Sequence, residues 1–166
     1  MSEFGRRLEE EIPHLRRYAR ALVHDPERAE DLVQSSLLRA LTKKDLWQAG
    51  TNLRSWLFTI LHNQHVSELR RLARDRERSG LLDGVLVPAP AGAAFSVFDL
   101  DRAVSELPDE QRRVVLLAGV KEMSYKEAAA VLCVPVGTVR SRLARAREKL
   151  RKRLEIAEED LLRLAA

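Results

Sequence analysis

The distribution of glycine and proline divides this chain of 166 residues into three parts. No glycine lies between Gly5 and Gly50, whereas SGLLDGVLVPAPAGAAFS (79–96) holds three of the seven glycines and two of the six prolines. Both residue types interrupt regular structure, so we interpret 79–97 as a linker. Helical periodicity fills 6–78 and 98–160, without strand-like alternation of useful length. The sequence therefore predicts an all-α protein of two small helical domains joined by a flexible linker.

Positive charge is concentrated in one short segment. The chain has 29 Lys and Arg against 25 Asp and Glu, but residues 140–153 carry eight basic residues and a single acid, Glu148. A local excess of this kind is the expected footprint of a polyanionic partner such as DNA. The alternative is a solvated helix face.

Several protein classes are disfavoured by composition. The single Cys133 excludes an internal disulfide and a cysteine-based zinc site. Acids in MSEFGRRLEEEI replace the apolar stretch of a signal peptide, and no run approaches the ~18 apolar residues of a membrane span, so we expect a cytoplasmic protein without a membrane segment. His62 and His65 lack a third ligand at suitable spacing, and no phosphate loop or nucleophile motif is found. We expect no metal, no cofactor and no enzymatic activity.

In the first domain, DPERAEDLVQSSLLRAL predicts a helix capped by Asp25 with Pro26 at its first position. Its periodicity predicts one buried face, made of Ala29, Leu32, Val33, Ser36, Leu37, Ala40 and Leu41. Leu38 lies on the opposite, polar face, either as an isolated exposed leucine or as the centre of a docking patch.

A second helix is predicted after GTN, in LRSWLFTILHNQHVSELRRLARDRER. One stripe of this helix turns from apolar to polar along its length: Trp56, Ile60, Asn63 and Ser67. The stripe is interpreted either as core that ends at the surface or as a polar pocket beside an aromatic ring. Such a pocket suits an extruded base, which needs stacking and hydrogen bonds.

The second domain contains a predicted helix-turn-helix. Ser124 and Glu127 have the spacing of a capping box, a turn is expected at Cys133 and Val134, and a second helix follows from Pro135. The face expected to be buried consists of Val139, Leu143, Ala146 and Leu150. The face expected to point outward, toward base edges and phosphates, consists of Gly137, Arg140, Ser141, Ala144 and Arg145. We also expect the later cations of this helix to neutralise the DNA backbone.

Four segments, AEDLVQSSLLRAL, GTNLRSWLFTILHN, LPDEQRRVVLL and SYKEAAAVLCVPVGTVRSRLARAREKLR, resemble bacterial RNA polymerase sigma factors of the extracytoplasmic-function (ECF) subfamily. The segments GTNLRSWLFTILHN and YKEAAAVL resemble sequences of the alphaproteobacterial general-stress branch of this subfamily. The resemblance implies a region 2 domain at 6–78, which docks on the clamp helices of the polymerase beta-prime subunit and melts the −10 element. It also implies a region 4 domain at 98–160, which binds the beta flap and reads the −35 element.

The resemblance also assigns residues. The core-polymerase contacts fall on Asp31, Leu32, Gln34 and Leu38. The −10 contacts fall on Gly50, Thr51, Asn52, Trp56, Asn63 and Ser67, where many family members have a second asparagine in place of Ser67. The −35 contacts fall on Pro135, Val136, Gly137, Thr138, Arg140, Ser141, Ala144 and Arg145. Many relatives also have glycine where this chain has Cys133, which therefore is expected to need a positive φ.

The implied protein is an alternative sigma factor, monomeric when free, that binds core RNA polymerase and promoter DNA in a stress response and is held by an anti-sigma factor. We expect the apolar residues of 79–96 and the segment EEDLLRLAA (158–166) to pack in a closed free form or against that inhibitor. The alternative is a stand-alone helix-turn-helix regulator, which usually dimerises on a palindrome. Nothing in the sequence resembles a dimerisation helix, and 6–78 has no role in such a regulator.

Overall fold

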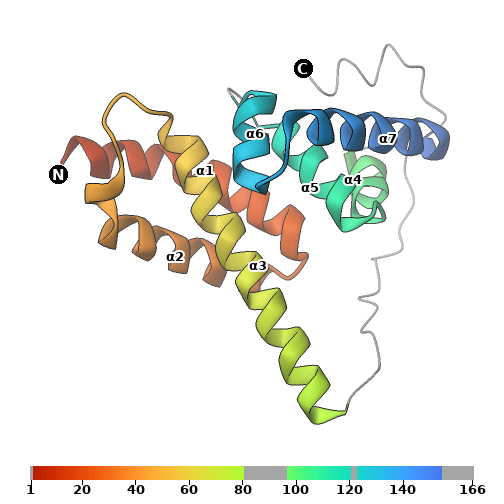
Figure 1. Ribbon diagram of the computed structural model, residues 1–166, viewed down its shortest axis with the longest axis horizontal. Helices are drawn as coiled ribbons and strands as arrows, with labels where there is room; N and C mark the ends of the chain where they lie inside the picture. Colours follow the sequence, from red (N-terminus) through yellow and green to blue (C-terminus); the bar gives the residue numbers. More distant parts are fainter. Residues whose placement is uncertain (1, 81–96, 121–122, 155–166) are drawn as a thin grey trace.

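The computed structural model describes residues 2–80, 97–120 and 123–154, and within these ranges it is helical with no strand (Figure 1). The first unit comprises α1 (Glu3–Val23), α2 (Pro26–Thr42), the short 3-10 helix η1 (Lys44–Leu46) and α3 (Leu53–Ser79). The second comprises α4 (Val97–Ser105), α5 (Asp109–Ala118), α6 (Tyr125–Leu132) and α7 (Val136–Leu154). The predicted all-α architecture of two helical domains is confirmed. Most of the linker and residues 155–160 lie outside the described residues.

Side-chain caps fix two of the helix starts that the sequence predicts. The Asp25 carboxylate accepts hydrogen bonds from the backbone N–H groups of Glu27 and Arg28, at 3.0 and 3.2 Å, ahead of Pro26. At α6, the Glu127 N–H donates to Ser124 Oγ and the Ser124 N–H donates to the Glu127 carboxylate. These bonds satisfy amides that a helix start otherwise leaves without partners.

The buried face of α2 agrees with the predicted periodicity except at Leu37, which is half-buried, and at Leu41. Ala29, Leu32, Val33, Ser36 and Ala40 are buried, and Ser36 Oγ lies 2.6 Å from both the Leu32 carbonyl and the Gln64 side chain. The prediction that Leu41 is buried was wrong, because 47% of this residue is exposed. Helical spacing gives the side on which a residue lies, but in the last turn of α2 no neighbouring helix covers that side.

The helix-turn-helix forms where the sequence predicts it. α6 ends at Leu132, and Cys133 takes the left-handed conformation with φ of 55° while its N–H bonds the carbonyls of Ala129 and Ala130. In α7 the four residues expected to be buried are buried, together with Leu154. The five residues expected to face outward are all exposed.

The two units pack directly against each other. α6 contacts α3, and α5 contacts α1 (Figure 1). One continuous cluster of buried side chains includes Leu57 and Leu61 of the first unit and Val114, Leu117 and Val131 of the second. A shared core therefore joins the units, independently of the chain between them.

The backbone at Cys133 gives a stability prediction. A non-glycine residue in the left-handed region costs roughly 1–2 kcal/mol, and glycine is the residue that helix ends favour there. We expect Cys133→Gly to raise the free energy of unfolding by about 0.5–1 kcal/mol, after allowing for the greater entropy of glycine in the unfolded chain. Denaturant unfolding measures the change. Cys133→Ser keeps the strained backbone, and an equal gain in that variant would refute the explanation.

Candidate nucleic-acid interface

The outward face of α7 presents arginines that have no partner in the described part of the protein. Arg140 and Arg145 are exposed and make no hydrogen bond or salt bridge to the described residues. Between them lie the small side chains of Ser141 and Ala144, and a Cβ added at Gly137 would meet nothing within 4 Å. Small residues beside free guanidinium groups leave room for base edges to approach, as direct readout in the major groove requires.

Several other cations of α7 are paired within the protein. Arg142 bridges to Glu110 at 3.2 Å, Arg151 and Lys152 share Glu148, and Arg153 pairs with Glu106. Exposed ion pairs contribute only ~0–1 kcal/mol each, so phosphates can compete for these cations. Neutralisation of the DNA backbone by the later cations therefore stays a prediction, and it requires that phosphates replace the acidic partners of these side chains.

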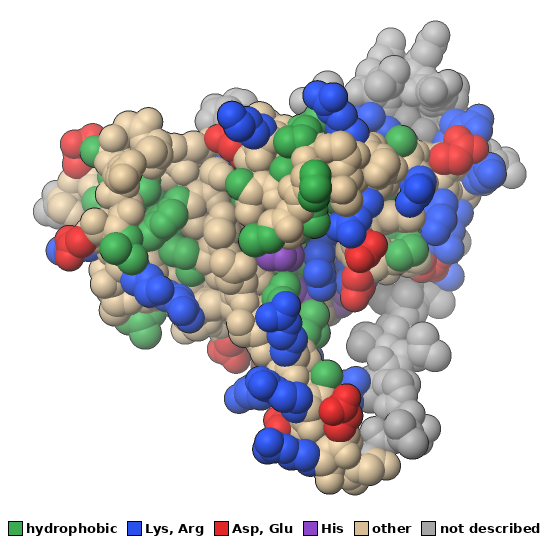
Figure 2. Space-filling model, in the orientation of Figure 1, with side chains coloured by type: hydrophobic (Ala, Val, Ile, Leu, Met, Phe, Trp, Pro, Cys, Tyr) green, Lys and Arg blue, Asp and Glu red, His purple; other side chains and the backbone are tan. Residues whose placement is uncertain are grey.

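A second basic region was not recognised from the sequence. Figure 2 shows Lys and Arg side chains gathered along α7 and at the end of α3 that projects from the body of the protein. That end of α3 carries Arg70, Arg71, Arg74, Arg76 and Arg78, all of them exposed. The signal was present in the string RRLARDRER, but the interspersed Asp75 and Glu77 lower its net charge.

The loop before α3 holds the first three residues of the predicted −10 set. Gly50 has φ of 92°, Thr51 Oγ1 donates to the Gln48 carbonyl at 2.7 Å, and Asn52 Oδ1 caps α3 by accepting from the Ser55 N–H. The other end of the Asn52 side chain reaches the second unit, where its Nδ2 donates to Glu127 Oε1 at 2.6 Å. Burial alone would raise the pKa of Glu127, but the hydrogen bonds from the Ser124 backbone, from Asn52 and from the Ser124 side chain together lower it. The loop is therefore tied to α6.

The remaining residues of the −10 set lie along α3 and are not gathered around one cavity. Trp56 is half-buried against Phe4, with ring centroids 6.4 Å apart, whereas Asn63 and Ser67 are exposed. Asn63 lies eleven positions after Asn52, which corresponds to about 16 Å of helix. Ser67 lies farther along still, so the structure shows a stripe along the first half of α3 (Leu53–Ser79).

Ser67 lies instead beside α2, in a groove of about 350 Å³ that is also lined by Asp31 and Leu32 of the predicted docking set. Asp31 and Gln34 are exposed, and Leu38 is 64% exposed on the same helix. Leu32 is only 4% exposed, so it supports this surface from below and does not form it. The structure adds two exposed leucines that sequence reasoning missed, Leu41 and Leu46, the latter 69% exposed. We call Leu38, Leu41 and Leu46 the leucine patch.

Comparison with known proteins identifies the family. Residues 8–62 match the family model described as the Sigma2 domain of PhyR, and residues 98–150 match Sigma-70, region 4. The chain is 43% identical over 141 residues to the ECF RNA polymerase sigma factor EcfG of Rhodopseudomonas palustris (strain TIE-1), covering 84% of this chain and 78% of that protein. The chain belongs to the ECF sigma factors. Proteins of this family initiate transcription as DNA-binding factors and are not enzymes.

Two solved structures resemble this sigma factor as a whole. One is the sigma factor RpoE in complex with the anti-sigma factor NepR from Bartonella quintana, with a TM-score of 0.81, 34% identity and coverage of 95% of this chain and 100% of that one. The other is CnrH in complex with the cytosolic domain of CnrY, with a TM-score of 0.65, 27% identity and coverage of 92% and 87%. The first similarity spans both helical units.

Two buried histidines of this sigma factor lie where the second unit covers α3. His62 and His65 are 5% and 6% exposed. Burial, together with the positive charge of Arg113 on α5, lowers the pKa of each histidine to about 4, and His65 lowers the pKa of His62 further. Asp109 and Glu68 raise the pKa of His65 without offsetting the other effects. Within the described residues no group of three or more potential ligands is placed to hold a metal ion.

None of the helices in the described ranges combines the length and the apolar character needed to cross a bilayer.

The two histidines make the stability of the sigma factor depend on pH. Because their pKa is near 4 in the folded chain and 6.5 ordinarily, the unfolded chain binds more protons between these values, so stability rises with pH across this window. We expect the free energy of unfolding to be highest above pH 6.5 and to fall by about 3 kcal/mol for each histidine as the pH drops toward 4. Denaturant unfolding at a series of pH values measures this slope.

The double variant His62→Gln with His65→Gln should flatten the slope. An unaltered slope in the double variant would show that other groups cause the acid sensitivity.

Proposed function

We propose that this ECF sigma factor binds core RNA polymerase and directs transcription initiation at one class of promoter, in a stress response and under the control of an anti-sigma factor. The observation that carries the proposal is the helix-turn-helix, whose outward face bears two unpartnered arginines, on the same chain as an exposed leucine patch. A DNA-reading face and an apolar docking face on one small protein are what a specificity subunit of a larger polymerase requires.

We assign polymerase docking to the first unit, 6–78, through the clamp helices of the beta-prime subunit. Asp31, Gln34 and Leu38 supply the exposed contacts and Leu32 holds them in place from the core. The leucine patch extends this surface to η1. The second unit, 98–160, binds the beta flap, and 79–97 connects the two docking sites.

Promoter contacts are assigned to two surfaces. The −10 element is bound by the loop before α3 and by the stripe on α3, comprising Gly50, Thr51, Asn52, Trp56, Asn63 and Ser67. The −35 element is bound by the start of α7, comprising Pro135, Val136, Gly137, Thr138, Arg140, Ser141, Ala144 and Arg145. In the described arrangement the second surface is free, while Asn52 of the first is bonded to Glu127.

Control by an anti-sigma factor is supported by the similar structure of the sigma factor RpoE, which was solved in complex with the anti-sigma factor NepR. Membership of the general-stress branch is supported by the matches to EcfG and to the PhyR domain model. We propose that the free sigma factor is a cytoplasmic monomer.

The experiment that tests the proposed function is run-off transcription on fragmented genomic DNA of the source organism, with sigma-free core polymerase in the presence or absence of this protein. New transcripts whose start sites share −35 and −10 elements are expected. If no transcript appears and the protein alone binds a palindromic site as a dimer, the function is that of a stand-alone helix-turn-helix regulator.

A charge placed in the leucine patch should abolish polymerase binding. We expect Leu38→Asp to leave the helical circular dichroism signal unchanged, because this side chain is 64% exposed, while co-elution with core polymerase is lost. Leu69→Asp provides the control, since Leu69 is also exposed but lies on α3 away from the patch. Equal retention of core binding by both variants would remove the patch from the docking site.

The free arginines of α7 should read individual bases. We expect Arg140→Ala and Arg145→Ala each to cost roughly 1–3 kcal/mol at one position of the −35 element and to relax specificity there. Lys149→Ala, on the same helix, should weaken binding to all sequences equally and reduce its salt dependence. Transcription from a panel of single-base promoter variants distinguishes these patterns. A uniform effect of the arginine substitutions would mean that they contact phosphates only.

A further inference from the structure

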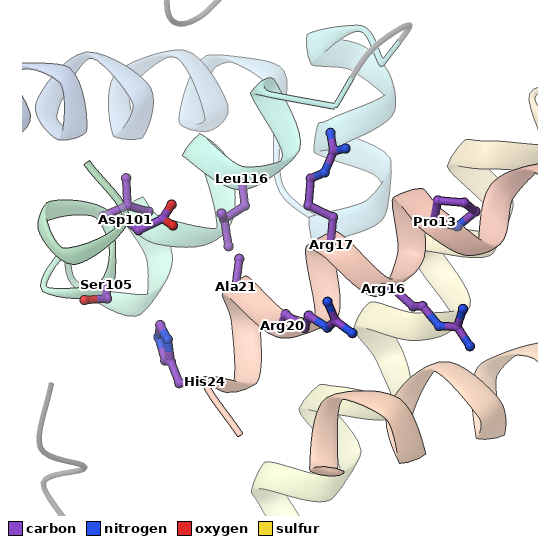
Figure 3. A pocket seen from close by; sticks show the side chains of 10 residues that line it. Pro13, Arg16, Arg17, Arg20, Ala21, His24, Asp101, Ser105 and Leu116 are labelled. Atoms are coloured by element: carbon purple, nitrogen blue, oxygen red, sulfur yellow. The ribbon is translucent and has the colours of Figure 1, made fainter. Parts of the chain in front are cut away.

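A groove of about 580 Å³ opens between α1 of the first unit and α4 and α5 of the second (Figure 3). Its α1 wall carries Arg16, Arg17 and Arg20, all of them exposed; Arg17 directly follows Arg16, and Arg20 lies about one turn further along the helix. The opposite wall includes Asp101 and Ser105 of α4, together with an apolar floor that the two units share. That floor is formed by Ala21, Val104 and Leu116.

Most of the charge in this groove lacks a partner in the described residues. Arg16 is paired with Glu30 at 2.7 Å, and this contact raises the pKa of Arg16. The side chains of Arg17, Arg20 and Asp101 make no hydrogen bond or salt bridge to any described residue, although the charge of Arg20 acts on Glu30 and helps to lower its pKa, after the larger effect of Arg16. A groove with two free guanidinium groups over an apolar floor fits a segment that combines carboxylates with leucines.

The chain itself contains such a segment directly after α7. Residues 155–166 (EIAEEDLLRLAA) hold four acids and a single base, Arg163, and their apolar residues include Leu161, Leu162 and Leu164. The other candidate within the chain, 81–96, has Asp83 as its only charged residue. The acidic segment therefore complements the arginines, and its one base complements Asp101.

The acidic segment also starts beside the groove. Leu154, the last described residue of α7, packs in one cluster with Ala103 and Leu107 of α4. Val104 packs against that same cluster and lines the groove. The segment thus begins on one side of α4 while the groove lies on the other, about one helix diameter of ~10 Å away. Twelve residues span up to ~40 Å when extended, or ~18 Å as a helix, so either form reaches the groove.

We call the groove between α1, α4 and α5 the arginine groove, and we propose that it is the docking site of residues 155–166 of the same chain. The carboxylates of Glu158, Glu159 and Asp160 pair with Arg17 and Arg20, and the leucines cover the apolar floor. Because α1 belongs to the first unit and α7 to the second, the docked segment holds the two units together in addition to the shared core. We call this docked segment the clasp. Each exposed ion pair contributes little alone, so the clasp depends on the group of charges and on salt concentration.

The test uses the full-length protein with a spin label at residue 165 (Ala165→Cys, in a Cys133→Ser background), read through the amide NMR signals of α1 and α4. We expect the label to broaden signals of residues 16–24 and 101–105. The pair Arg17→Glu and Arg20→Glu should abolish this broadening. Adding Glu158→Lys, Glu159→Lys and Asp160→Lys to those two substitutions should restore the broadening, because the charges of both partners are then reversed and attract each other again. Arg70→Glu with Arg71→Glu, on the projecting end of α3, is the matched control and should leave the broadening unchanged.

Three outcomes overturn the proposal. The first is broadening that does not reach the groove or that survives the arginine reversal. The second is broadening of the groove signals by a label at residue 86 and not by the label at residue 165, which would make 81–96 the occupant. The third is a change at the groove only after an acidic anti-sigma factor is added, which would make a partner the occupant. The readout does not involve transcription, so a negative result would reject the docking of residues 155–166 without bearing on the proposed function.

Discussion

The packing of α6 against α3 is the contact on which the rest of this structure depends. Ala128 and Ala129 are buried in α6, and their small side chains let the second unit approach the first closely. Leu57 and Leu61 of α3 and Val131 of α6 belong to the same continuous core. Burial of apolar area contributes roughly 25 cal/mol per Å², so a core shared between two units favours one closed body over two separate domains.

The shared core decides which functional surfaces are available. It lets Asn52 donate a hydrogen bond to Glu127, and it buries His62 and His65 near the positive charge of Arg113. The outward face of α7 and the leucine patch are exposed in this arrangement, whereas the loop of the −10 set is tied to α6. A partner that needs the loop must therefore bind the open form more tightly than the closed one, by at least the free energy of the interface it disrupts. Contacts to the outward face of α7 and to the leucine patch are available in the closed form too, so they favour neither form. The difference in affinity must come from contacts that only the open form allows.

Local features of the fold could be predicted from the sequence because local chemistry determines them. Asp25 with Pro26, and Ser124 with Glu127, mark helix starts through the amides they cap, and the break at Cys133 separates two periodic runs. The outward arginines of α7 follow from the spacing of its buried residues. Likewise, a positive φ was expected at Cys133, and the structure has it.

Features that depend on contacts between distant segments could not be predicted in this way. Helical spacing places Leu41 on the buried side, but whether a neighbour covers that side depends on how the helices are assembled. The bond between Asn52 and Glu127 joins residues 75 positions apart, and no sequence pattern records it. The same holds for the arginine groove, whose two walls come from different units. The resemblance assigned roles to Leu32 and Ser67 without showing where their side chains lie. The structure shows that Leu32 is buried and that Ser67 lies in the groove beside α2.

The central claim is that the two units of the free protein form one closed body through a shared core. Its most direct test is the distance distribution between spin labels at Arg70→Cys on α3 and Lys149→Cys on α7, both exposed, in a Cys133→Ser background. Pulsed electron spin resonance on the free protein should give a single narrow distribution. That distribution should broaden when the pH falls toward 4 and the buried histidines become protonated. A broad distribution at neutral pH, independent of pH, would show that the units are joined only by the chain between them and would contradict the account.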